Sequence, residues 1–139
     1  MYGVYAEVFP EIGGFWTEMA LDEVQHANWI DKCCAKVENN QEFFVVERFR
    51  IQPLEFSIKS VKEQAVAARE PGFSLLNALS IALQLEKALL ENKYFEVFDG
   101  DSEGVKNTLN QLVESTKVHY QKVYEHWKAY GGRELKKSF

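Results

Sequence analysis

The stretch FWTEMALDEVQHANWIDKCCAKV, residues 15–37, decides the fold. Apolar side chains recur along it at helical spacing, at Phe15, Trp16, Met19, Ala20, Ala27, Ile30, Cys34 and Val37. On a helical wheel, Glu23 occupies the centre of this apolar arc, and His26 follows one turn later on the same arc. The stretch therefore predicts a long helix whose buried face carries a carboxylate and an imidazole.

Four further helices are predicted on either side of this one. Their expected ranges are residues 1–9, 53–68, 74–98 and 104–130, with turns at Pro10–Gly14, Pro71-Gly72 and residues 99–102. Ser74 is the expected N-cap of its helix. The aromatic and β-branched segment 42–51 has no clean period and fits either an extended segment or a poor helix. We expect one bundle over residues 1–130 and a short basic tail over residues 131–139.

Composition narrows the class of protein. A chain of 139 residues is about one domain long, and 16 basic against 21 acidic residues give a net charge of −5, without the basic patch of a nucleic-acid-binding protein. No signal peptide or membrane span is readable, so we expect a cytoplasmic protein. Cys33 and Cys34 are adjacent and belong to no CxxC motif, which predicts two reduced thiols acting as small core residues.

Two more polar residues fall where apolar ones belong. Glu86 interrupts the apolar arc of the helix after Ser74, and His119 lies near the edge of the arc of the last helix. One inward Glu or His is more often a capped or water-bridged core residue than a ligand. Two carboxylates on separate apolar faces, with a Glu-x-x-His pair, are explained together by one shared metal. The candidate metal ligands are Glu23, His26, Glu86 and His119.

Several segments around these residues resemble the rubrerythrin-related branch of the ferritin-like superfamily. They are YAEVFP (5–10) and ALDEVQHA (20–27), similar to its first hairpin, ALSIALQLE (78–86), similar to its third helix, and residues 109–119, similar to its fourth. The resemblance implies an all-α, ferritin-like four-helix bundle. In this chain its first helix is truncated, and an extra amphipathic helix lies in the central crossover.

Members of that branch hold two irons through four carboxylates and two histidines, and this chain departs from the pattern twice. Thr116 stands where the last helix should carry a Glu three residues before its His. The carboxylate of the first helix would fall near or before residue 1, where Tyr2 is the nearest residue. Two carboxylates and two histidines suit one iron, manganese or zinc ion better than a dinuclear centre.

The resemblance implies a metal-binding protein, with iron as the first expectation, that reduces peroxide or oxygen. Tyr2 or Tyr5 would be a nearby donor, and a separate protein would supply electrons, because the rubredoxin domain is missing. The short first helix leaves apolar surface on its partners, so we expect a homodimer. The alternative is a non-catalytic bundle with a degenerate metal site that serves as a dimerisation or interaction module.

Overall fold

The computed structural model describes residues 1–46 and 51–133, and over these ranges the chain is all-helical. Its elements are α1 (Tyr2–Val8), the 3-10 turn η1 (Pro10–Ile12), α2 (Gly13–Glu38), α3 (Ile51–Ala67), α4 (Leu75–Glu91) and α5 (Glu103–Ala129). Each of the five predicted helices is present. Part of the ambiguous segment 42–51 and most of the predicted basic tail, residues 47–50 and 134–139, lie outside the described residues.

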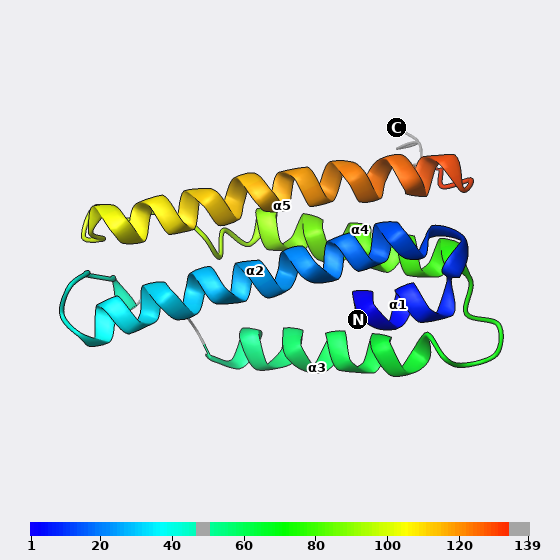
Figure 1. Ribbon diagram of the computed structural model, residues 1–139, viewed down its shortest axis with the longest axis horizontal. Coiled ribbons are helices and arrows are strands. Elements are labelled where there is room, and N and C mark those ends of the chain that lie inside the picture. The colour runs from blue at the N-terminus through cyan, green and yellow to red at the C-terminus, as the bar shows by residue number, and fades with distance from the viewer. Residues whose placement is uncertain (47–50, 134–139) are drawn as a thin grey trace, which may run out of the picture.

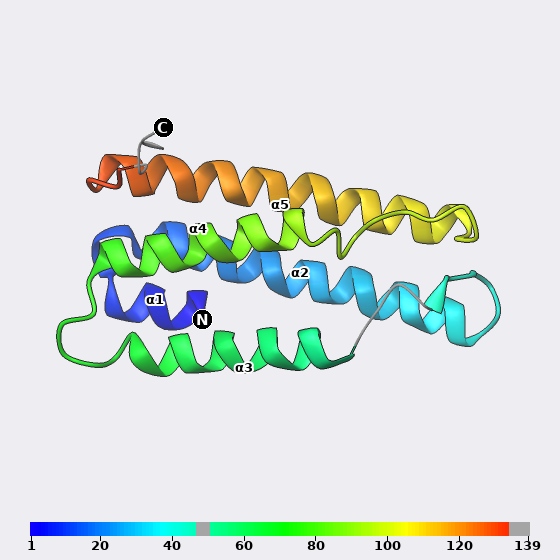
Figure 2. The same cartoon turned by 180° about the vertical axis from the view of Figure 1, so that it is seen from behind.

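The two longest helices, α2 and α5, run antiparallel along the length of the molecule (Figure 1). Helix α4 packs against α5, and α1 packs against the N-terminal half of α2 as the second arm of a hairpin. Seen from behind, α1 still lies between α2 and α3, so α3 contacts the rest of the molecule mainly through α1 (Figure 2). None of the helices described is long and apolar enough to cross a membrane.

The ends of α4 show where periodicity predicts correctly and where it does not. Ser74 caps the helix as predicted, since its hydroxyl accepts from the backbone N–H of Asn77 in a capping box. The predicted end near Phe98 is wrong, because the helix stops at Glu91 and Lys93 adopts a left-handed φ of 53°. Phe95 and Val97 pack against a core cluster on α5, but they do so from an irregular segment.

Aromatic side chains lock the α1–α2 hairpin. The rings of Tyr5 and Trp16 are fully buried and meet edge to face, with centroids 5.0 Å apart. Tyr2 stacks on Trp16 at 5.6 Å, and its ring centroid lies 6.4 Å from that of Tyr5. Such contacts add to the large apolar area that these rings remove from water. The hairpin thereby holds the side chain of Tyr2 beside the middle of α2 and α4.

Helix α1 covers only part of the apolar arc of α2. The sequence predicts Ala27, Ile30 and Cys34 on the buried arc, and the structure contradicts this, because all three are exposed. Helix α1 packs against α2 but extends along only one half of it (Figure 1). Cys33 is partly buried, as expected of a residue on the edge of that arc.

Candidate metal centre

Three of the four predicted ligands meet between α2 and α5. One ligand atom from each of Glu23, His26 and His119 lies within 4.8 Å of the others. Glu23 Oε1 is 3.0 Å from His119 Nδ1, and Glu23 Oε2 is 3.2 Å from His26 Nδ1. The spacing of three residues places Glu23 and His26 side by side on α2. Two imidazole nitrogens therefore face one carboxylate.

The fourth predicted ligand, Glu86, reaches the same region from α4. Its Oε1 is 3.8 Å from His119 Nδ1 and accepts a hydrogen bond from the hydroxyl of Tyr2. Only 1% of Glu86 is exposed. Glu86 is thus adjacent to the compact group of three but does not belong to it.

Two buried atoms of this cluster lack the partners that buried polar atoms normally have. Within the described part of the chain, Glu86 Oε2 and His119 Nδ1 make no hydrogen bond. The 3.0 Å approach of Glu23 to His119 Nδ1 brings the two atoms close but does not have hydrogen-bond geometry. Unpaired buried groups are rare in native proteins and call for an explanation such as an ion. A cation between these atoms would satisfy both, so the residues fit a metal.

The outer nitrogens of both imidazoles are held by neighbours that the sequence analysis missed. His119 Nε2 lies 3.2 Å from Asp22 Oδ2, and His26 Nε2 lies 2.6 Å from Ser115 Oγ. Histidines that bind metals usually donate their second N–H in this way, which directs the other nitrogen to the ion. Asp22 and Ser115 flank the core faces of their helices, so a search for polar residues on those faces does not find them.

Asp22 gives a prediction about the outer contacts of the centre. Asp22→Asn should weaken metal binding roughly ten-fold, because the carboxylate that orients His119 and increases its basicity is lost. Titration of the metal-free protein with Fe(II) under anaerobic conditions measures the change. Asp31→Asn removes the same charge from the exposed surface of α2 and should leave the affinity within a factor of two or so. Equal losses in both variants would show a general charge effect.

The ionisable groups of the cluster influence one another strongly. Burial, reinforced by the charge of Glu23, raises the pKa of Glu86 to about 7, although Tyr2 and His119 act in the opposite direction. Burial also opposes the ionisation of Glu23, but His119 and His26 outweigh it and lower the pKa of Glu23. Burial disfavours the charged form of His119, yet Glu23, Glu86 and Asp22 together raise its pKa. The surrounding carboxylates therefore favour a positive charge at this point.

A pocket connects the cluster to the surface. It has a volume of about 470 Å³ and lies beyond the N-terminus of α1, between α2, α3 and α4. Glu23 and Glu86 form part of its wall, together with Tyr2 and apolar residues such as Val61 and Leu89. The side chain of Glu23 is 40% exposed. A small molecule can therefore reach the carboxylate of Glu23 without any movement of the helices, whereas that of Glu86 is buried in the pocket wall.

Other residues weighed in the sequence lie where the helical wheels place them. Thr116 is buried, but its hydroxyl donates to the carbonyl of Leu112 at 2.8 Å, so α5 offers the cluster no carboxylate at that position. Glu114 is exposed and pairs with Lys117. The hydroxyl of Tyr5 is buried and has no hydrogen-bond partner among the described residues. Of the two predicted tyrosine donors, Tyr2 is the one in contact with the site.

No family model, curated protein or solved structure matches this chain. The resemblance to the rubrerythrin-related branch therefore stays a prediction, and the geometry of the Glu23, His26 and His119 cluster is what supports a function.

Proposed function

We propose that this protein is a ferritin-like helical bundle of rubrerythrin ancestry that binds one metal ion through Glu23, His26 and His119, with Glu86 as a fourth ligand. Iron is the first choice of metal, and manganese or zinc are the alternatives. Two carboxylates balance the charge of a divalent ion, and the two imidazoles bind it as neutral ligands. The centre would reduce peroxide or oxygen with electrons from a separate protein.

The observation that carries this proposal is the convergence of ligand atoms that lack other partners. His119 Nδ1 faces both Glu23 and Glu86, while its Nε2 is held by Asp22. A water-bridged polar core would also place carboxylates near imidazoles. It gives no reason for both imidazoles to turn Nδ1 toward the same carboxylate and to have Nε2 held from outside.

Bound iron would supply electron transfer and Lewis acidity toward a peroxide. The reduction of hydrogen peroxide to two water molecules also consumes two electrons and two protons. The hydroxyl of Tyr2 holds a proton at the inner end of the open pocket, because it donates to Glu86. The chain thus places an exchangeable proton next to the proposed metal.

Metal loading is the direct test. Protein purified without chelators should contain iron, manganese or zinc, and adding Fe(II) to the metal-free form should raise its Tm. At a free metal concentration of about 100 times Kd, the stabilisation is about 2.7 kcal/mol, which for a domain of this size is roughly 10 °C. Elemental analysis and anaerobic thermal unfolding measure both quantities. A protein free of all three metals whose Tm does not respond to Fe(II), Mn(II) or Zn(II) would contradict the proposal.

The exposed apolar residues of α2 and α3 favour the second candidate, an interaction module with a degenerate site. The large apolar side chains of these helices that are exposed to solvent include Leu21, Val24, Phe56, Ile58 and Val66. Patches of this kind often mark a protein interface. We expect a homodimer, and light scattering at micromolar concentration checks it. A dimer that binds no metal would favour the second candidate, whereas a monomer would count against the module.

A further inference from the structure

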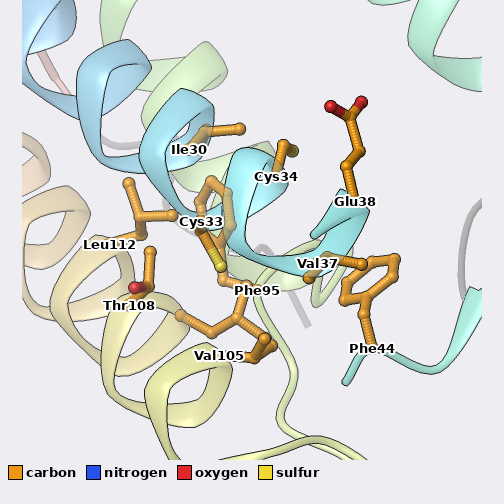
Figure 3. Close-up of a pocket in the computed structure, with 11 residues that line it drawn as sticks. Ile30, Cys33, Cys34, Val37, Glu38, Phe44, Phe95, Val105, Thr108 and Leu112 are labelled. Atoms are coloured by element: carbon orange, nitrogen blue, oxygen red, sulfur yellow. The ribbon is translucent and has the colours of Figure 1, made fainter. Parts of the chain in front are cut away.

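A second cavity lies at the other end of the molecule from the α1–α2 hairpin. It has a volume of about 300 Å³ and is enclosed by the last turns of α2, the first turns of α5 and the two segments that join these helices to their neighbours. Figure 3 shows the side chains around it, including Cys33, Val37, Phe44, Phe95 and Val105. None of the candidate metal ligands lines it, so the cavity is separate from the metal centre.

Hydrogen bonds between the two joining segments hold this cavity open. The backbone N–H of Val45 donates to Asp101 Oδ1 at 3.0 Å, and the N–H of Phe98 donates to Asp101 Oδ2 at 2.8 Å. The N–H of Ser102 donates to the carbonyl of Phe43 at 2.9 Å. These contacts fix the backbone on either side of Phe44 and after Phe95. The cavity is therefore preformed, as small-molecule sites usually are.

Among the described residues, the lining holds no positive charge and no free side-chain donor for an anion. Its two polar residues besides the cysteines are Thr108 and Glu38. The hydroxyl of Thr108 is used, since it donates to the carbonyl of Gly104 at 3.1 Å. The carboxylate of Glu38 points away from the cavity, as Figure 3 shows. A charge placed inside would lose its water without gaining a partner, which costs several kcal/mol.

The remaining walls suit an aromatic molecule. Phe44 and Phe95 can pack against a ring in offset or edge-to-face contact. The sulfur of Cys33 points toward Phe95 among the lining residues, and sulfur makes favourable contacts with ring edges. An engineered apolar cavity of about 150 Å³ holds one benzene, so the space here is about twice that and takes two fused rings.

We propose that this cavity is a binding site for an uncharged aromatic molecule of about the size of naphthalene. The site is independent of the metal centre, so binding is expected in the metal-free protein. One molecule binds per chain, and the ring system lies between Phe44, Phe95 and Cys33.

Naphthalene and 2-naphthoate form a matched pair of probes for this site. Naphthalene should bind the metal-free protein saturably, at one site per chain, and 2-naphthoate should bind at least roughly ten-fold more weakly because its carboxylate has no partner inside. Titration followed by naphthalene fluorescence measures the two affinities.

A pair of variants tests the position of the site. Cys33→Phe, which fills the cavity with a ring, should weaken naphthalene binding at least roughly ten-fold, whereas Cys33→Ala should keep the affinity unchanged. Equal affinity for the two probes, or undiminished binding by folded Cys33→Phe, would overturn the proposal.

Alkylation of the cysteine thiols tests the same binding site without a substitution that fills the cavity. In the variant Cys34→Ser, Cys33 is the single thiol, and naphthalene should slow its alkylation by iodoacetamide several-fold. In Cys33→Ser, Cys34 is the single thiol; it also lines the cavity but is exposed to solvent, so naphthalene should slow its alkylation less than that of Cys33. Unchanged alkylation of Cys33 in the presence of naphthalene would place any bound probe elsewhere and refute the site.

Discussion

Replacing Glu23 by Gln should abolish metal binding. Glu23 is the residue that both imidazoles face, so it takes part in two of the three ligand pairs of the compact group. Loss of an outer-shell partner typically lowers metal affinity 10- to 100-fold, and loss of this central ligand should lower it more than about 100-fold. Gln keeps the size of the side chain but removes the negative charge. Anaerobic Fe(II) titration of the metal-free variant measures the change.

The matched control is Glu114→Gln. Glu114 lies on α5 close to His119 in sequence, but its side chain is exposed and pairs with Lys117 on the outer surface. This variant should bind Fe(II) like the original protein, because an exposed ion pair contributes little and lies away from the site. If Glu23→Gln still binds the metal with unchanged affinity while both variants are folded, the ligand set proposed around Glu23 is wrong.

The residues that periodicity could identify are those that must point inward. An apolar arc interrupted by Glu23 or Glu86 is visible in one helix at a time; Glu23 lies in the compact group, and Glu86 lies beside it. Asp22 and Ser115 could not be found in this way, because they lie beside the arcs and become relevant only when α2 and α5 are placed together. Helical wheels give directions within one helix, not distances between helices.

The length of a helix and its coverage by neighbours were harder to predict. The sequence predicts that the helix continues to about Phe98, beyond the true end of α4, but Phe95 and Val97 pack from an irregular segment against a separate core cluster on α5. Ile30 lies on the apolar arc of α2 and is nonetheless 41% exposed, since α1 does not extend along that part of α2. A wheel shows which side is apolar, whereas burial depends on a partner helix of sufficient length.

Glu86→Gln should stabilise the metal-free protein at neutral and alkaline pH. Burial raises the pKa of Glu86 from about 4.5 to about 7, so the folded state holds a proton that the unfolded state has released over this interval. Stability from this group is therefore complete below about pH 4.5 and is lost as the pH rises through 7. The loss amounts to about 3 kcal/mol. Gln resembles the protonated form of Glu86, can still accept the hydrogen bond from the hydroxyl of Tyr2, and does not ionise.

The comparison therefore requires two pH values and one control. At pH 8 in the presence of a chelator, urea unfolding should give Glu86→Gln a free energy of unfolding about 3 kcal/mol above that of the original protein. At pH 4.5 the two should agree. Glu91 is an exposed residue of the same helix that pairs with Lys87, and Glu91→Gln should change the free energy of unfolding by less than about 0.5 kcal/mol at either pH.

Because Glu86 is also a proposed ligand, Glu86→Gln should weaken Fe(II) binding as well. This one variant is then more stable than the original protein without metal and binds the metal less tightly. A Glu86→Gln protein less stable than the original at both pH values would mean that the buried carboxylate is needed for folding, and that its position is not explained by metal binding.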